Sequence, residues 1–510
     1  MLELRNSSLF KNQAYIDGEW QDARKGRTFG VANPFDQKLI TTVPDLGVIE
    51  CRKAIDAAYK SFQEWKEYTA SERAHILRRW YELQIENLDD LARLLTIEQG
   101  KPLEEAKGEI RYGASFVEWY AEEARRIYGD VIPGHGRDKR ITVIKQPVGV
   151  VGAITPWNFP NAMITRKVAP ALAAGCTVVI KPSELTPLSA LALAELGEQA
   201  GFPRGVLNII TTLDAPAIGQ ELTSNPKVKK ISFTGSTAVG KILLKQSADS
   251  VKKVSLELGG NAPFIVFDDA NVDAAVEGAI ASKFRNAGQT CVCSNRIFAQ
   301  AGIYDEFVQK LSKAISKLNM GNGLEEGINI GPLIEAKALD FVEKVVENAR
   351  NGGAIIMTGG KVSATNPLLY EPTLITHPST EMMLFHEEIF GPVAPVFKFE
   401  TEKEVIELAN DTQFGLASYF YGRDYARIWR VAEALEYGMV GINTGMISTT
   451  VAPFGGIKES GIGREGSKYG IERCNSCRNH AGIDSHHSIF QGFGYPPNPC
   501  IISPIKIGGK

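Results

Sequence analysis

The sequence predicts an α/β protein with a doubly wound parallel sheet, a second α/β unit and a small β ribbon. Between residues 149 and 267, short β-rich runs alternate with helical ones, a pattern typical of a parallel sheet with helices on both faces. A second alternation of this kind follows Gly260. Because 510 residues exceed one ordinary core, two or three domains are expected.

A hairpin and a layer of helices are expected ahead of the first sheet. Asp17-Gly18 supplies the positive φ angles of a tight turn in the β-prone residues 15–20. Over residues 49–126 the apolar side chains recur at helical spacing, and Gly100 is expected to end a long second helix as its C-cap. Residues 140–145 alternate and predict an edge strand or a protruding ribbon.

The remaining elements are predicted as short segments. The strands of the first sheet are expected at residues 150–154, 177–180, 206–210, 230–234 and 264–267. The second unit is expected to contain helices at residues 273–284 and 304–318, and strands near residues 354–357 and 374–376.

The composition indicates a globular protein whose partner is a small metabolite. Hydrophobic residues make up 44% of the chain and charged residues 23%, which is ordinary for a soluble domain. With 56 basic and 59 acidic residues the net charge is −3. Such a balance offers no field that would attract nucleic acid or an anionic membrane surface.

The amino end and the cysteines favour the cytoplasm. The first residues lack the basic start and apolar core of a signal peptide, and the longest nearly apolar run, residues 168–180, is too short to span a bilayer. The seven cysteines are odd in number and scattered, which fits reduced thiols better than a disulfide framework. No metal site is expected.

Cys291 is the clearest candidate for chemistry, because it lies among small, polar and cationic residues. The thiolate is the nucleophilic form of cysteine, and Arg285 and Arg296 are expected to favour it. The alternative is a small core residue, which is the commoner role of a single cysteine.

Two further stretches offer groups that would work with a nucleophile. Glu257 lies in an apolar, glycine-ended run, where an unpaired carboxylate is expected to have a raised pKa and to act as a base. Asn158 lies between two prolines, and its amide is a candidate donor to a developing oxyanion. The alternatives are an ion-paired strand glutamate and a turn asparagine.

A glycine-containing run, residues 235–241, follows a predicted strand and opens a helix whose N-terminus is suited to a phosphate. The run nearly matches a P-loop, so a nucleotide triphosphatase or kinase is the rival class. A P-loop needs a serine or threonine after the lysine to hold magnesium, and Ile242 stands there instead.

Over residues 14–472 the sequence resembles the aldehyde dehydrogenase superfamily, because the stretches around Asn158, Glu257 and Cys291 agree with its motifs in order and spacing. The resemblance implies that Cys291 attacks an aldehyde, Asn158 holds the oxyanion and Glu257 activates a water. It implies a dinucleotide-binding domain at residues 1–127 and 148–258, and a catalytic domain at residues 259–460. It assigns residues 128–147 and 461–510 to an oligomerisation ribbon and an atypical tail.

The resemblance also implies a site for NAD, with NADP as a further possibility. Glu184, three residues after Lys181, favours free ribose hydroxyls over a 2′-phosphate, because a phosphate beside a carboxylate is a like-charge contact. A loop ion pair between these two residues is the alternative. Glu388 is expected to hold the nicotinamide ribose and Phe390 to pack on the ring, against the alternative of a capping acid and a core phenylalanine. The full cofactor set is Thr155, Pro156, Trp157, Lys181, Ser183, Glu184, Gly235, Ser236, Gly240, Leu258, Glu388 and Phe390.

Within the superfamily, Arg166, Arg285 and Ser448 match the positions that hold the substrate carboxylate in succinate-semialdehyde dehydrogenases. A guanidinium binds a carboxylate through two parallel hydrogen bonds, so succinate semialdehyde is the expected substrate. Glutarate semialdehyde is the alternative, since one methylene discriminates by only about 1–3 kcal/mol. The other alternative is an enzyme of broader aldehyde specificity, in which both arginines form structural ion pairs.

Cys293 places a second thiol two residues after Cys291. Some succinate-semialdehyde dehydrogenases close such a pair into a disulfide that stops activity, and a strained bond of this kind is easily reduced. A buried inert thiol is the alternative.

From Arg473 onward the sequence departs from the resemblance and is expected to form a flexible tail. Cys474, Cys477, His480 and His486 match no strong zinc template. The tail replaces a strand that pairs at the subunit interface, so residues 140–145 are expected to have an open edge. A homodimer or homotetramer is still expected. A scaffold that has lost catalysis finds little support, because all the chemical residues are present.

Overall fold

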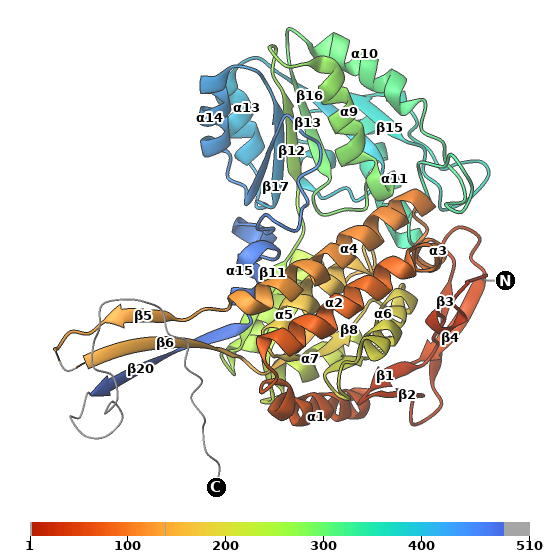
Figure 1. Ribbon diagram of the computed structural model, residues 1–510. Coiled ribbons are helices and arrows are strands. Elements are labelled where there is room, and N and C mark those ends of the chain that lie inside the picture. The colour runs from red at the N-terminus through yellow and green to blue at the C-terminus, as the bar shows by residue number, and fades with distance from the viewer. Residues whose placement is uncertain (1–2, 138, 484–510) are drawn as a thin grey trace. The chain divides into compact units, whose positions relative to one another are not determined.

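Two sheets, one of eight strands and one of seven, with the helices packed on them, organise the first of two units (Figure 1). The computed structural model describes residues 3–137 and 139–483, and for Arg140 and residues 477–483 it describes the backbone alone. The chain divides into two units, residues 1–127 with 146–476, and residues 128–145 with those after 476. Both sheets lie in the first unit.

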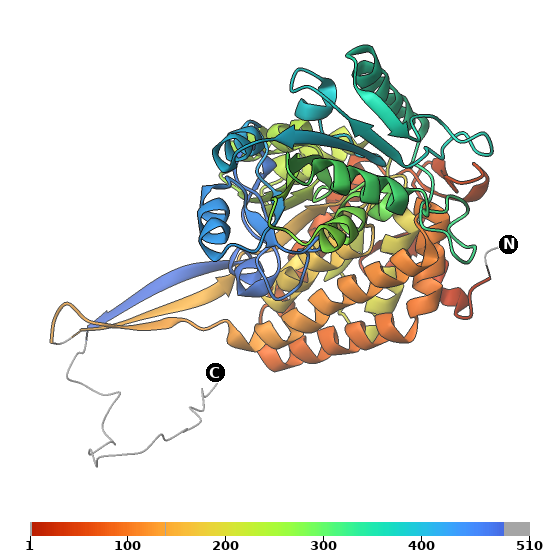
Figure 2. The ribbon, with the colours of Figure 1, turned by 90° about the horizontal axis from the view of Figure 1, so that it is seen from above.

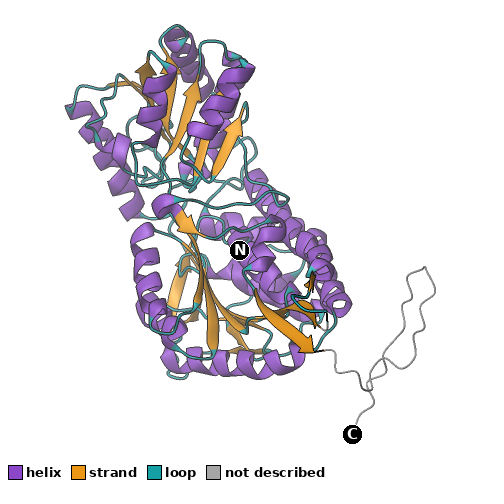
Figure 3. Ribbon diagram, turned by 90° about the vertical axis from the view of Figure 1, so that its left-hand side faces the viewer, coloured by secondary structure: helices purple, strands orange, loops and turns teal. Residues whose placement is uncertain are grey.

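The eight-stranded sheet is the expected doubly wound sheet. Its strands are β1 (Ala14–Ile16), β2 (Glu19–Gln21), β7 (Val150–Ile154), β8 (Thr177–Lys181), β9 (Leu207–Ile209), β10 (Val228–Thr234), β11 (Lys253–Glu257) and β19 (Gly461–Ile462). Their order is β19-β11-β10-β7-β8-β9-β1-β2, and β7 to β11 run parallel. Helices lie on both faces of the sheet (Figure 3). The strands β7 and β8 are almost wholly buried because such a sheet exposes neither face.

The helices of this half follow the predicted amphipathic pattern, with one difference. They are α1 (Val48–Trp65), α2 (Ala70–Glu86), α3 (Leu88–Gln99), α4 (Leu103–Glu123), α5 (Ala162–Ala173), α6 (Pro187–Ala200), α7 (Ala215–Ser224) and α8 (Thr237–Ala248). The predicted long second helix is wrong, because Asn87 separates α2 from α3. Gly100 is confirmed as a C-cap, but of α3, with φ at 97°.

The predicted strand at residues 264–267 is also misassigned. It corresponds to β12 (Ala262–Val266), which lies in the seven-stranded sheet, and the fifth parallel strand of the first sheet is β11. The chain crosses from one sheet to the other between Leu258 and Asn261. Sequence alone could not separate the two strands, since both are buried and such strands carry the same apolar signal.

The seven-stranded sheet belongs to the predicted second α/β unit. Besides β12 it contains β13 (Ser294–Gln300), β14 (Ile355–Thr358), β15 (Thr373–Thr376), β16 (Val393–Phe399), β17 (Ala417–Tyr421) and β18 (Met439–Ile442). The order is β14-β15-β16-β13-β12-β17-β18, and only β14 runs antiparallel to its neighbour. The accompanying helices are α9 (Val272–Lys283), α10 (Tyr304–Ile315), α11 (Ala336–Asn351), α12 (Met383–His386), α13 (Glu402–Asn410) and α14 (Tyr425–Ala434), whereas α15 (Ser467–Glu472) packs on α4 and α5.

Short elements complete the first unit. The strands β3 (Thr28–Ala32) and β4 (Leu39–Pro44) form a separate antiparallel hairpin. The 3₁₀ helices are η1 (Ser7–Leu9), η2 (Ala124–Arg126), η3 (Arg285–Gly288) and η4 (Lys458–Ser460).

The second unit contains the predicted ribbon. Its strands are β5 (Asp130–Pro133), β6 (Lys139–Pro147) and β20 (Asn475–Ile483), with β6 in the middle (Figure 2). The expectation that β6 would be an edge strand with one open side is therefore wrong. The atypical sequence after Arg473 still forms a strand, because strand pairing uses backbone groups that every residue except proline supplies. The rest of the predicted tail, residues 484–510, lies outside the described residues.

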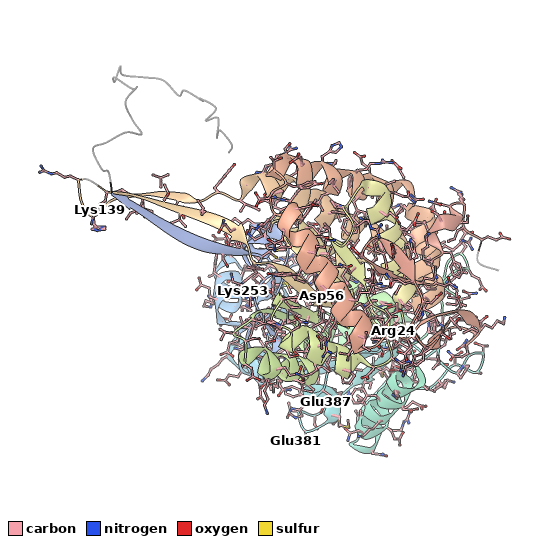
Figure 4. All side chains as sticks on the ribbon, turned by 90° about the horizontal axis from the view of Figure 1, so that it is seen from below. Arg24, Asp56, Lys139, Lys253, Glu381 and Glu387 are labelled. Carbon is pink, nitrogen blue, oxygen red and sulfur yellow. The ribbon has the colours of Figure 1, made fainter. Side chains whose placement is uncertain are left out.

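The surface carries charges of both signs, as exposed Arg24, Asp56, Glu381 and Glu387 illustrate (Figure 4). This agrees with the near balance of acidic and basic residues in the sequence. In residues 3–137 and 139–483 no helix is long and apolar enough to cross a membrane. In the same described part of the chain, no three His, Cys, Asp or Glu side chains gather as a metal site would require.

Replacing Gly100 by alanine should destabilise the protein more than the same change at Gly201. Both glycines cap helices with φ above 90°, so each substitution costs about 1 kcal/mol of backbone strain. A Cβ at Gly100 would also lie 2.8 Å from Pro332 and 2.9 Å from Pro34, whereas nothing lies within 4 Å at Gly201. Urea unfolding should show a loss larger by about 1–3 kcal/mol for Gly100→Ala; equal losses would contradict the packing argument.

Candidate active site

The carboxyl ends of four parallel strands bring several predicted residues to one edge of the first sheet. Ile154 at the end of β7 pairs with Lys181 of β8 and with Phe233 of β10. Thr234, the last residue of β10, pairs with Glu257 at the end of β11. Ligands of open parallel sheets bind at this edge, and the segments that begin at Thr155, Gly235 and Leu258 all leave from it.

Cys291 is held by a loop with an unusual backbone. Asn286 and Ala287 in η3 adopt left-handed conformations, with φ of 51° and 54°. Two donors fix this bend: Gln99 Nε2 donates to Asn286 Oδ1 (3.0 Å), and the Asn286 backbone N–H donates to Glu105 Oε2 (2.7 Å). Gln289 Nε2 then donates to the Asn286 carbonyl (3.0 Å), which closes the loop just before the cysteine.

The crossing between the sheets lies against Cys291. A Cβ on Gly260 would be 2.4 Å from the Cys291 carbonyl oxygen, so only glycine permits this approach. Glu257 is three residues earlier on the same segment. This close approach of the two backbone segments therefore places the carboxylate of Glu257 near the Cys291 thiol.

The thiol of Cys291 is not held in its ionised form. The pKa of Cys291 is raised to about 12, chiefly by burial; Arg166 and Arg285 oppose the rise, and the charges of Glu388 and Glu257 add to it. The expectation that Arg285 favours the thiolate is confirmed in direction, but desolvation outweighs the cations and the net shift is upward. The proton must be removed before this sulfur can act as a nucleophile.

The hydrogen bonds of Arg296 are to backbone carbonyls and a tyrosine hydroxyl, and not to the Cys291 thiol. Its buried guanidinium donates to the carbonyls of Asn261 (3.0 Å), Leu408 (2.8 Å) and Ala409 (2.8 Å) and to the Tyr437 hydroxyl (2.9 Å). It connects β13 to the last turn of α13. The predicted role of Arg296 is therefore corrected to a structural one.

Glu257 is buried, and neither carboxylate oxygen has a hydrogen-bond partner among the described residues. Burial raises the pKa of Glu257 well above its usual value, and the nearby charge of Glu465 raises it further, while Arg166, Lys167 and Arg464 oppose the shift. The predicted rise in pKa is confirmed. The group is suited to take and release protons, since neither charge state is locked by a hydrogen bond.

Glu465 forms the central ion pair of the site. Its carboxylate accepts hydrogen bonds from Arg166 Nε and Lys167 Nζ, and all three side chains are buried. Burial alone would raise the pKa of Glu465, but the two cations lower it to about 2. Glu465 therefore stays charged while Glu257 is driven toward its neutral form.

Arg166 and Arg285 each keep a guanidinium nitrogen free. Arg166 Nη2 and Arg285 Nε are buried and have no partner among the described residues. The Arg166 guanidinium also lies 4.0 Å from the Phe454 ring centroid, and that of Arg285 lies 5.4 Å from Phe159. Arg166 is thus an ion-pair residue, as the structural alternative held, yet it retains an unused donor as well.

Tyr112 of α4 completes this region and was not predicted. Its hydroxyl is buried without a partner in the described part of the chain. Burial raises its pKa, whereas the charges of Arg166 and Arg285 lower it. The loop after β18, which carries half-buried Ser448, reaches α4 through a 2.5 Å hydrogen bond between Ser115 and Thr450.

Asn158 lies in the loop after β7, and its side chain points toward the cysteine loop. Asn158 Nδ2 donates to the Gln289 carbonyl at 3.1 Å, which leaves its second amide hydrogen for another acceptor. The side chain is buried, so any such acceptor would be shielded from bulk water. Gln289 is two residues before Cys291.

Sequence reasoning missed Tyr112, Lys167, Gly260 and Glu465 as members of the site. The signal for Gly260 was present, since paired glycines end the run that holds Glu257. No feature of the neighbouring sequence links Tyr112 or Glu465 to Cys291. The packing of α4 and of the segment before α15 brings both residues to this region.

The chain matches the aldehyde dehydrogenase family over residues 20–479. It belongs to the aldehyde dehydrogenase family. The glutarate-semialdehyde dehydrogenase of Pseudomonas aeruginosa is 62% identical over 471 residues, covering 92% of this chain and 97% of that protein. The NADP-dependent succinate-semialdehyde dehydrogenase of Escherichia coli is 60% identical over 471 residues, covering 92% and 98%.

A solved structure supports the same assignment. The succinate-semialdehyde dehydrogenase of Burkholderia pseudomallei has a TM-score of 0.94 and 57% identity, covering 94% of this chain and 100% of that one. This aldehyde dehydrogenase is therefore an oxidoreductase that works with NAD or NADP. The rival class of P-loop proteins is not supported; Lys241, which would contact phosphate, instead pairs with Glu459 at 2.7 Å.

The edge of the first sheet fits a dinucleotide. The hydroxyls of Thr155 and Thr234 are buried at the strand ends and lack partners among the described residues. Ser236 caps α8, and the N–H groups of its first turn are suited to a phosphate. A Cβ on Gly240 would lie 2.5 Å from Leu258, so this turn packs closely on the residue that follows Glu257.

Lys181 and Glu184 form an ion pair of 3.1 Å at this edge. The alternative of a loop ion pair is thus present in the structure. Lys181 is nearly buried while Glu184 keeps 40% of its side chain exposed, so the carboxylate can still meet a ligand. Ser183 Oγ accepts the Leu185 N–H at 3.2 Å, which fixes the turn between them.

The residues predicted to contact the nicotinamide come from both halves of the first unit. Trp157, beside Pro156, meets Phe390 edge-to-face with ring centroids 5.6 Å apart. Phe390 is half-buried and has φ of 52°, a strained conformation for an aromatic residue. Glu388 accepts the Gly260 N–H at 3.0 Å, and burial raises its pKa to about 7.

Cys293 is buried, and its thiol donates to the Lys283 carbonyl at 3.4 Å. Cys291 and Cys293 are both free thiols in the structure. Burial raises the pKa of Cys293, and Lys283 lowers it.

Replacing Arg285 by methionine should slow the alkylation of Cys291. Removing a cation that lowers the thiol pKa raises that pKa further, so the thiolate fraction falls at every pH below it. We expect iodoacetamide to label Cys291 up to about tenfold more slowly, which corresponds to one pKa unit. Peptide mapping against pH measures this, and Arg430→Met, which removes an exposed partner of Glu402, is the control. An unchanged rate would show that Arg285 does not act on the thiol.

Proposed function

We propose that this aldehyde dehydrogenase oxidises succinate semialdehyde to succinate with reduction of NAD or NADP. The observation that carries the proposal is the pair of buried, unpartnered guanidinium nitrogens, Arg166 Nη2 and Arg285 Nε. Both arginines act electrostatically on the Cys291 thiol and on Tyr112. A carboxylate at the far end of a short aldehyde would satisfy these donors, since guanidinium and carboxylate match in charge and shape.

In the proposed first step, the Cys291 sulfur adds to the aldehyde carbon. Because the thiol pKa lies near 12, a base must take its proton, and Glu257 is the candidate because its carboxylate is free of hydrogen bonds. The oxygen of the resulting thiohemiacetal becomes an oxyanion. The free amide hydrogen of Asn158 and the backbone N–H of Cys291 stabilise it, which concentrates binding on the transition state.

Oxidation of the thiohemiacetal leaves a thioester on Cys291. NAD or NADP, when bound, supplies the hydride acceptor for this step. Once Glu257 has released the thiol proton to solvent, it deprotonates a water that attacks the thioester, which releases the acid and the Cys291 thiolate. The raised pKa of Glu257 suits this second role, because a carboxylate with an ordinary pKa would be a much weaker base at neutral pH.

Glutarate semialdehyde is the second candidate substrate. It carries the same carboxylate and one more methylene, and the 62% identity with a glutarate-semialdehyde dehydrogenase favours it. A single methylene changes binding by only about 1–3 kcal/mol, so the same arginines can accept both acids.

We infer a preference for NAD over NADP. Lys181 is already engaged by Glu184, so a 2′-phosphate at this point would meet a carboxylate and only a partly neutralised lysine. The sequence identity with an NADP-dependent relative favours NADP instead.

The proposal includes a cytoplasmic homodimer or homotetramer. Five free thiols among the described residues favour a reducing compartment. The outer strands β5 and β20 of the ribbon have one unpaired edge each among the described strands, and such edges invite pairing with a second copy.

Replacing Cys291 by serine should abolish turnover. Because Glu257 is proposed to accept a proton in both half-reactions, Glu257→Gln should slow the first formation of NADH and lower the steady rate by about 10²–10⁴-fold. A first phase at the wild-type rate would show that another group takes the thiol proton. Stopped-flow absorbance measures both phases. Cys51→Ala, a buried thiol on α1, should behave as wild type. A Cys291→Ala enzyme with normal activity would end the proposal.

The substrate assignment predicts a clear order of kcat/KM. Succinate semialdehyde should exceed butanal, which has four carbons and no carboxylate, and NAD should exceed NADP. Arg285→Met should lower the ratio of kcat/KM for the acid to kcat/KM for butanal by about ten- to a hundredfold, the value of a charged hydrogen bond. If the wild-type enzyme oxidises butanal equally fast, the two arginines have only structural roles. If it prefers glutarate semialdehyde, that aldehyde is the substrate.

A further inference from the structure

A buried ion pair lies behind the loop that carries Asn158. Lys101 follows the Gly100 cap of α3, and Glu109 lies in the second turn of α4. Their side chains have no exposed surface, and Lys101 Nζ lies 2.6 Å from Glu109 Oε2. Neither residue takes part in a step of the proposed reaction.

The pair binds backbone groups at both ends of the Asn158 loop. Lys101 Nζ donates to the Asn158 carbonyl at 2.8 Å and lies 3.7 Å from the centroid of the Phe159 ring. The other carboxylate oxygen, Glu109 Oε1, accepts the N–H groups of Asn161 (3.0 Å) and Ala162 (3.2 Å) at the start of α5.

The cysteine loop holds the same residue from the opposite side. Asn286 Nδ2 donates to the Asn158 carbonyl at 3.0 Å. Asn158 Nδ2 in turn donates to the Gln289 carbonyl at 3.1 Å. The carbonyl of Asn158 thus accepts two hydrogen bonds, and the direction of its side chain is set against the loop that ends at Cys291.

Stability alone does not explain this arrangement. Burial lowers the pKa of Lys101, and the charge of Glu109 opposes the change, so the ammonium is held at an electrostatic cost. Apolar side chains of similar volume often stabilise a protein as well as a buried ion pair does. What the pair supplies, and apolar side chains cannot, is a set of directed hydrogen bonds to the loop.

We propose that Lys101, with Glu109, is a positioning residue that holds Asn158 in line with the oxyanion. The inference rests on the proposed function, in which the Asn158 amide stabilises that charge. An oxyanion donor must lie at about 2.7–3.1 Å from the charged oxygen, and a displacement of about 1 Å can cost about 10²-fold in rate. The buried pair is the part of the fold that prevents this displacement.

The test is a double-mutant cycle between the ion pair and Asn158. Lys101→Met alone would leave a lone buried carboxylate, so the variant combines Lys101→Met with Glu109→Gln, which removes both charges and keeps the side-chain lengths similar. It is made in the wild type and in Asn158→Ala. For each enzyme kcat, KM and Tm are measured with succinate semialdehyde and NAD.

The control is Glu98→Gln, which also alters a buried carboxylate that caps a helix. Glu98 accepts the N–H groups of Leu188 (2.8 Å) and Ser189 (2.7 Å) at the start of α6. We expect it to lower Tm and leave kcat of the folded enzyme unchanged.

The expected result is a fall in kcat of about ten- to a hundredfold for the paired variant, with a smaller change in KM. In the Asn158→Ala background the same substitutions should change kcat by less than about twofold, because the group that they position is gone. The fall in Tm should be the same in both backgrounds, which separates positioning from folding.

Two kinds of result would contradict the positioning role of the ion pair or the oxyanion role of Asn158. A normal kcat in the paired variant, or an equal fall in both backgrounds, would show that the ion pair does not act through Asn158. A normal kcat in Asn158→Ala alone would instead refute the oxyanion role in the proposed function, and the positioning inference would fall with it.

Discussion

The carboxylate of Glu465 is the interaction on which the site depends. It arrives from the segment before α15 and forms ion pairs with Arg166 and Lys167, which are neighbours on α5. The pair fixes α5 against the late part of the chain and keeps both cations buried. It uses Arg166 Nε and leaves Nη2 free, so one ion pair fixes the arginine and also presents its remaining donor. Its negative charge helps to raise the pKa of Glu257.

Around that ion pair, the active site is built from groups whose charge is suppressed by burial. Burial raises the pKa values of both the Cys291 thiol and the Glu257 carboxyl. Only the ionised fraction of Glu257 can accept the thiol proton, and the raised pKa makes that carboxylate a stronger base, which no hydrogen bond to a described residue holds in one charge state. The same desolvation strengthens each hydrogen bond to a developing oxyanion. Reactivity in this site therefore depends on proton transfer during the reaction and not on a thiolate formed in advance.

Much of the architecture follows from local pattern. The alternation of strands and helices, the hairpin at residues 15–20 and the Gly100 cap are confirmed. The strand at residues 264–267 was given to the wrong sheet, and the tail after Arg473 forms β20 where a flexible segment was expected. Both errors concern which strands become neighbours. A buried strand has the same composition in either sheet, and backbone pairing accepts many side chains, so such choices are made by tertiary contacts.

The sequence by itself indicated the fold class, the order of the motifs and an apolar surrounding for Glu257, because each follows from patterns of residue types along the chain. The tertiary structure decided the partners. It turned Arg296 toward backbone carbonyls, gave Arg166 an ion pair and a free nitrogen, and brought Tyr112 to the arginines. It also left the Cys291 thiol protonated, although cations flank it in sequence. Burial and hydrogen-bond partners come from residues far apart in the chain, and those two quantities decide the charge of a buried group.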